Sequence, residues 1–122
     1  GFVMPKKKVS LPKYVHLSYL KIKLEQLDSE LSYQVADQQG SFVEKPPATI
    51  YLDKEIIERG GLDAVNLVIH EMCHAIEYLA QLTNLSVTDP NRAEEGRVTA
   101  YSNYLTEIIS KSELRDWIRD NT

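Results

Sequence analysis

The segment from residue 62 to residue 83 constrains this chain most, because its apolar residues recur at the spacing of one long helix. One apolar stripe along that helix contains Val65, Ile69, Met72, Ile76 and Leu79. Further apolar residues lie on the other side, namely Ala64, Leu67, Ala75 and Tyr78. We therefore expect a helix over residues 62–83 that is buried on more than one face.

Two histidines and a glutamate lie within this helix in the order His70-Glu71-Met72-Cys73-His74. Helix positions four apart share a face, so both imidazoles can approach one Zn²⁺ ion at about 2.0–2.1 Å. The residue after the first histidine points to one side of the pair, where a carboxylate can act as general base on an attacking water. We predict that His70 and His74 are zinc ligands and that Glu71 is the catalytic base.

A catalytic zinc site takes three protein ligands, so a third ligand is expected elsewhere. Position 80, where one known pattern places a third histidine, is Ala80, which favours a carboxylate instead. The next expected helix starts after Asp89-Pro90 and runs to about residue 110. Its apolar stripe contains Val98, Tyr101, Leu105 and Ile108. Projected back one turn, this stripe places Glu94 on the core-facing side, where a carboxylate needs a cation. Glu94 is the predicted third ligand, and Glu95 is the alternative.

Other reactive side chains near the pattern have simpler interpretations. Glu77 is a candidate acceptor for an imidazole N–H. Tyr78 and Tyr101 are candidate hydroxyl donors to an oxyanion, although packing explains most tyrosines at such positions. Cys73 is expected in the core, and His16, the remaining histidine, is expected beside core leucines.

The rest of the chain predicts further helices around a small sheet. A stripe with three- and four-residue spacing predicts a helix over residues 13–31, and it contains Leu17, Leu20, Leu24, Leu27 and Leu31. Residues 32–43 are typical of a short hairpin, and residues 48–53 give the strongest strand signal, as an edge strand after Pro46-Pro47. Short helices are expected over residues 54–59 and 112–120.

Length and charge narrow the class of protein. The 122 residues suit one domain over 1–122, with residues 1–12 as a flexible N-terminal segment. The net charge of −4 disfavours nucleic-acid binding, and no apolar run reaches the length of a membrane span. The single cysteine excludes an intrachain disulfide and a four-thiolate zinc site, so we expect a cytoplasmic protein.

The pattern of His70, Glu71 and His74 followed by a glutamate-bearing helix resembles the gluzincin group of zinc metallopeptidases. More closely, the segments around 50–53 and 65–77, with Glu94, Glu95 and Val98, look like small metallopeptidases of phages and prophages related to the ImmA/IrrE type. The resemblance implies an α+β, minimal zincin-like domain in a bacterial or phage-infected cell. It implies a small antiparallel or mixed sheet of three short strands, the active-site helix and two or three further helices. It also implies that a peptide or protein substrate pairs with strand 48–53.

Two other interpretations of the same residues remain open. One is a non-catalytic, zinc-stabilised binding or assembly module of phage origin, which would bind metal without an open coordination position. The other is a metal-free helical interaction domain in which the pattern is coincidental. The oligomeric state and the substrate sequence do not follow from the residues.

Overall fold

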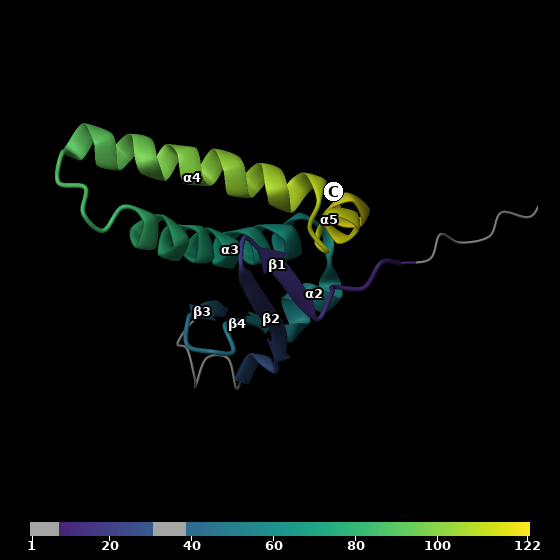
Figure 1. Ribbon diagram of the computed structural model, residues 1–122. Coiled ribbons are helices and arrows are strands. Elements are labelled where there is room, and N and C mark those ends of the chain that lie inside the picture. Colours follow the sequence, from purple (N-terminus) through teal and green to yellow (C-terminus); the bar gives the residue numbers. More distant parts are fainter. Residues whose placement is uncertain (1–7, 31–38) are drawn as a thin grey trace, which may run out of the picture.

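The computed structural model describes residues 8–30 and 39–122, and it has an α+β fold (Figure 1). Its strands are β1 (Tyr14–Leu17), β2 (Leu20–Leu27), β3 (Gly40–Val43) and β4 (Thr49–Asp53). Its helices are α2 (Lys54–Arg59), α3 (Gly61–Thr83), α4 (Pro90–Ser110) and α5 (Arg115–Asn121). The four strands form one mixed sheet in the order β1-β2-β4-β3, one strand more than expected. No helix among the described residues is both long enough and apolar enough to cross a membrane.

One face of the sheet and the inner side of α3 form the core. Alternate strand residues point to this face and are fully buried, including Val15, Leu17, Ile22, Ile50 and Leu52. From α3, Val68, Met72 and Ile76 are fully buried against them. α4 runs alongside α3 on the side away from the sheet, and α5 lies near the start of α3 (Figure 1). The middle of α3 is thereby held between the sheet and a second long helix.

The helix predicted over residues 13–31 is wrong, because residues 14–27 form the two strands β1 and β2. Val15 and Leu17 are buried while His16 between them is exposed, so the period that matters here is two. Ser18 has a φ of 55°, which turns the chain between the strands. Leu17 and Leu20 are paired strand residues on either side of this turn, and Leu31 lies outside the described residues. Pairing of β2 with β4 therefore outweighs the helical spacing of the leucines and makes this segment a strand.

The strand predicted over residues 48–53 is confirmed as β4, but its expected place at the sheet edge is wrong. β4 pairs in parallel with β2 over Thr49–Asp53 and antiparallel with β3 over residues 49–52. Pro46 and Pro47 precede Thr49, the first paired residue, so their missing N–H groups remove nothing from the ladder. With both edges occupied, β4 offers no free edge to a peptide backbone. Pairing of a substrate with strand 48–53 would require one of these neighbouring strands to move away, and it stays a prediction.

Most of the remaining predicted elements are confirmed. Asp53 caps α2 by accepting hydrogen bonds from Glu55 N at 2.9 Å and Ile56 N at 3.4 Å. Asp89 caps α4 by accepting from Asn91 N at 2.9 Å, with proline in the first turn as predicted. The long helices over 62–83 and 89–110 and the short helix over 54–59 are confirmed within one or two residues. Of the predicted hairpin, residues 32–37 lie outside the described residues and residues 42–43 belong to β3.

Candidate metal and catalytic site

Helix α3 brings His70, Glu71 and His74 together as one cluster. One possible ligand atom from each residue lies within 4.8 Å of the corresponding atoms of the other two. The two imidazole rings are one helical turn apart, with centroids 5.2 Å apart and planes at 76°. Both histidines are exposed, whereas Glu71 is buried. The sequence prediction that these three residues act together is consistent with this geometry.

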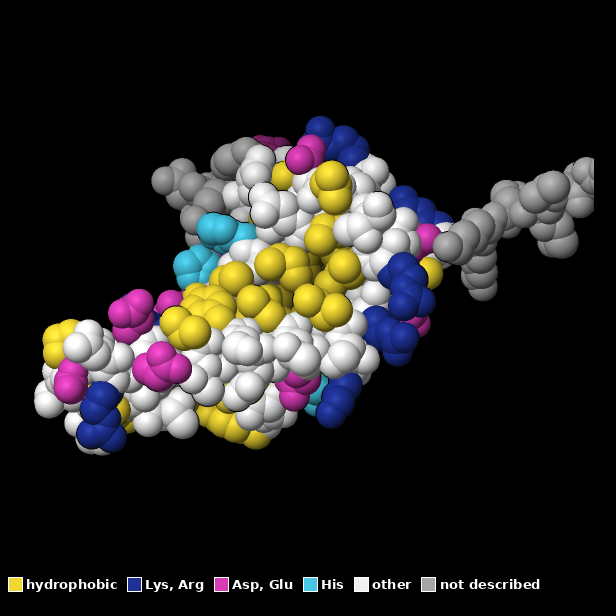
Figure 2. Space-filling view, turned by 90° about the horizontal axis from the view of Figure 1, so that it is seen from above, with side chains coloured by type: hydrophobic (Ala, Val, Ile, Leu, Met, Phe, Trp, Pro, Cys, Tyr) yellow, Lys and Arg dark blue, Asp and Glu magenta, His cyan; other side chains and the backbone are white. Residues whose placement is uncertain are grey.

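Packing of α3 explains why the histidines face outward. Val68, Met72 and Ile76 lie on the side of the helix that packs on the sheet and are fully buried. At about 100° per residue, positions 70 and 74 fall well away from this side and reach solvent. Figure 2 shows histidine side chains at the border between an apolar patch and acidic side chains. The outer surface of α3 therefore presents two imidazoles that a metal ion can reach.

Glu71 is the buried member of the cluster, with 3% of its surface exposed. Its Oε1 lies 4.0 Å from His70 Nε2, and among the described residues its buried Oε2 has no hydrogen-bond partner. Burial raises the pKa of the Glu71 carboxyl, and the nearby His74 and His70 partly oppose that rise. A buried carboxylate with an unsatisfied oxygen is suited to receive a proton or to face a cation.

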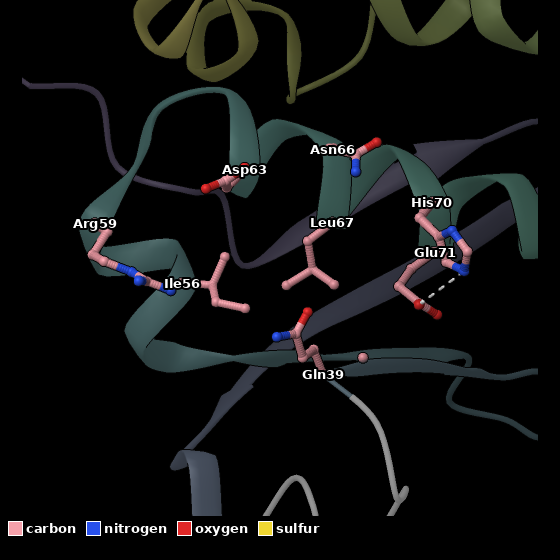
Figure 3. A pocket seen from close by; sticks show the side chains of 9 residues that line it. Gln39, Ile56, Arg59, Asp63, Asn66, Leu67, His70 and Glu71 are labelled. Carbon is pink, nitrogen blue, oxygen red and sulfur yellow. Dashed lines mark ion pairs between the residues drawn. The ribbon is translucent and has the colours of Figure 1, made fainter.

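A cavity of about 470 Å³ opens beside Glu71 and runs along the first turns of α3 (Figure 3). Leu67 and Ile56 form its apolar middle, between His70 and Glu71 at one end and Arg59 at the other. Its remaining lining comes from Gln39, Gly40, Asp63 and Asn66. The cluster therefore adjoins a space large enough for a side chain of a bound molecule.

The structure does not bring Glu94 or Glu95 into this cluster. Both are exposed residues of α4, so the expectation that Glu94 faces the core is wrong. The apolar stripe on which that expectation was based is itself partly exposed to solvent. Val98 is 54% exposed, and Ile108 is the buried residue of α4. The N-terminal half of α4 extends beyond the sheet, so its apolar positions meet less of the core (Figure 1). The role of Glu94 as a ligand stays a prediction.

The other candidates of the sequence lie near the cluster with different partners. Tyr101 donates a hydrogen bond to Glu77 Oε1 at 3.0 Å, and burial together with Glu77 raises its pKa to about 12. Tyr78 packs against Phe42, with ring centroids 6.1 Å apart. Cys73 is half-buried, and burial raises the pKa of its thiol. Packing and local hydrogen bonds thus account for these side chains.

His16 lies outside the cluster, and its expected place on a helix beside the core leucines is wrong. It is exposed on β1, where its Nδ1 lies 2.5 Å from Glu113 Oε2. The alternation of β1 that buries Val15 and Leu17 turns this imidazole to solvent.

Gly40 is the site residue that the sequence did not single out. It belongs to β3, pairs with Leu52, and lies against the Glu71 side chain. The turn-like residues 38–41 gave only a loop signal, because nothing in the sequence indicates that this strand packs on α3. The contact arises from sheet order alone.

The donor set is compatible with a bound zinc ion. Imidazole nitrogens are ligands that Zn²⁺ accepts, and here two of them lie one helical turn apart with the Glu71 carboxylate beside them. The unpartnered Oε2 of Glu71 is the observation that favours a polar occupant, because buried oxygens are otherwise almost always hydrogen-bonded. Comparisons with protein-family models, curated proteins and solved structures found no match to this chain.

Proposed function

We propose that this protein is a zinc-dependent peptidase. The observation that carries the proposal is the pairing of two exposed histidines one turn apart with a buried glutamate whose Oε2 has no partner among the described residues. The resemblance to small phage and prophage peptidases supports the same activity, and with it a place in the cytoplasm of a bacterial or phage-infected cell. His70 and His74 would hold the ion, with Glu94 or Glu95 of α4 as the third ligand.

When bound, zinc polarises the scissile carbonyl and makes water a better nucleophile at neutral pH. Glu71 accepts a proton from the water as its oxygen bonds to the carbonyl carbon. Glu71 then returns this proton to the amide nitrogen as the carbon–nitrogen bond breaks, which leaves a carboxylate and an amine. The raised pKa of Glu71 suits both steps, because the carboxyl can hold the proton between them.

Strand β3 is the strand on which we place the peptide substrate. Among the described residues it pairs only with β4, and its first residue lies against Glu71. An extended peptide added to such an edge gains backbone hydrogen bonds and presents alternate side chains to the protein. A substrate side chain beside the scissile bond would enter the cavity lined by Leu67 and Ile56.

Replacement of Glu71 by glutamine tests the mechanism. Glu71→Gln keeps the shape of the side chain and removes the base, so we expect zinc content to stay and peptide hydrolysis to fall by about 100-fold or more. Hydrolysis of a peptide library and metal analysis of the same samples give both readouts. Activity within a few-fold of the wild type would rule out Glu71 as the base.

A zinc-stabilised module without catalysis is the second candidate. The 65% exposure of the His70 side chain favours it, because a catalytic site is usually better shielded from water. This candidate predicts bound zinc in the wild-type protein and a large loss of thermal stability with a chelator. It also predicts no hydrolysis of any peptide, which separates it from the peptidase.

A further inference from the structure

Strand β3 approaches helix α3 closely at Gly40. A Cβ atom placed on Gly40 would lie 3.1 Å from both Cγ and Oε1 of Glu71 and 3.1 Å from Leu67 Cδ1. These distances are shorter than ordinary contacts between carbon atoms, which lie near 3.5–4.0 Å. Any larger residue at this position would therefore push on the Glu71 side chain.

The backbone at Gly40 does not itself require glycine. The glycines with positive φ among the described residues are Gly60 and Gly61, whereas Gly40 is a regular strand residue opposite Leu52. Glycine weakens a strand, and inside one it often marks a site where another group approaches closely. At Gly40 the approaching group is the Glu71 carboxylate, so the missing side chain has a local explanation.

The Gly40 backbone and the Leu67 side chain both lie close to the Glu71 side chain. Glu71 is only 3% exposed here, although the neighbouring His70 side chain is 65% exposed. A long carboxylate side chain in open solvent would sample several rotamers. In this confined place its Oε1 lies 4.0 Å from His70 Nε2.

We propose that Gly40 is a positioning residue that fixes the carboxylate of Glu71 beside the His70 and His74 pair. The inference rests on the proposed peptidase activity. Gly40 contributes no reacting atom. It acts because its missing side chain leaves room for the Glu71 carboxylate. A methyl group at this position moves the carboxylate by a few tenths of an ångström or more and leaves both histidines in place.

The variant Gly40→Ala tests this role against a matched control. Gly96→Ala also adds a methyl group in a crowded place, 2.5 Å from Asn84 Oδ1, but on α4 and away from Glu71. We expect Gly40→Ala to lower kcat by about tenfold, because misplacing a reacting group by about 1 Å can cost on the order of a hundredfold and the shift expected here is a few tenths of an ångström. KM and zinc content should change less than twofold. Gly96 lies beside the candidate ligands Glu94 and Glu95, so Gly96→Ala serves as the control for the thermal midpoint alone.

Three measurements on the full chain decide between the outcomes: kcat and KM for one peptide, zinc per chain, and the thermal midpoint. Wild-type kcat in a folded, zinc-loaded Gly40→Ala overturns the inference and leaves the peptidase standing. Loss of zinc together with kcat also overturns it, since the histidine site would then be what moved. An inactive wild-type protein overturns both proposals.

A second pair of variants covers the case in which Gly40→Ala does not fold. Leu67→Ala removes the close contact with Leu67 Cδ1, so Gly40→Ala combined with Leu67→Ala keeps only the two close contacts of the added methyl with Glu71. If Gly40 positions Glu71, the double variant should retain a lower kcat than Leu67→Ala alone. Equal kcat values in these two proteins would contradict the proposal.

Discussion

The hydroxyl group of Tyr101 on α4 donates a hydrogen bond to Glu77 on α3, three residues after His74, with an oxygen–oxygen distance of 3.0 Å. The same hydroxyl lies 3.5 Å from the carbonyl oxygen of Cys73. Two long antiparallel helices are therefore tied together by a polar contact at the level of the histidine pair.

Removal of this hydroxyl should weaken the contact between the helices without changing the chemistry of the site. We expect Tyr101→Phe to lower the free energy of unfolding by about 0.5–1.5 kcal/mol, the usual net value of one hydrogen bond. Tyr104→Phe is the control, because the described residues give Tyr104 no hydrogen bond. Urea denaturation of both variants measures the difference. Equal stabilities would show that the hydroxyl contributes nothing.

Glu94 and Glu95 should differ in their effect on zinc binding. Glu94 is seven residues before Tyr101 and shares its helix face, which turns towards α3 near Cys73. Glu95 instead lines a separate pocket with Thr83 and Asn103. We expect Glu94→Ala to weaken zinc binding by more than about tenfold. Loss of a residue that only hydrogen-bonds to a metal ligand already lowers metal affinity by about 10- to 100-fold. Glu95→Ala should bind zinc like the wild type in a chelator competition, and the reverse order would assign the role to Glu95.

The buried side of α3 should be the main source of stability. Met72 is fully buried against the sheet, so Met72→Ala should lower the free energy of unfolding by about 2–5 kcal/mol. Leu62 on the same helix is 70% exposed, and Leu62→Ala should change it by less than about 0.5 kcal/mol. Chemical denaturation with a constant m-value checks both. A small effect at Met72 would mean that the core relaxes around the missing side chain.

Acid should weaken the link between β1 and the chain segment before α5. Burial alone would raise the pKa of Glu113, but hydrogen bonds from the His16 side chain and backbone outweigh it and lower the pKa below 4.5. The resulting stability is fully present above pH 4.5 and is lost as the pH falls through the lower pKa of the folded state. Because both groups are partly exposed, the effect should be small.

Glu113→Gln should remove this part of the acid dependence. Unfolding free energies of the wild type and the variant should differ most above pH 4.5 and converge below the folded pKa. Glu44→Gln, at an exposed residue without a hydrogen bond to described residues, is the control. Parallel pH profiles of wild type and Glu113→Gln would contradict the link.

The helices and the site cluster could be predicted because their signals are local. Asp53 and Asp89 cap their helices through residues two or three positions away, and His70 and His74 meet through the turn of one helix. The α+β class followed from these helices together with the strand over 48–53. Each of these caps and the histidine pair depends only on residues within about one helical turn of one another.

The errors arose where distant segments decide the structure. The leucines of residues 17–27 fit a helical spacing, but pairing of β2 with β4 makes them strand residues. The exposure of Glu94 depends on how far α4 extends past the sheet, which the stripe of α4 does not reveal. Gly40 acquires its neighbour Glu71 only because β3 is placed at the edge beside α3.

The position of β4 between β2 and β3 has a consequence for synthesis on the ribosome. β4 is the last strand in the chain, and it is the strand that joins β2 to β3. In a nascent chain that ends before Thr49, β3 therefore has no strand that connects it to the β1–β2 hairpin. Pairing of β2 with β4 also closes a long loop, which is slow compared with forming a hairpin. The exit of residues 49–53 is therefore the step that permits the sheet to assemble, just before the histidine helix emerges.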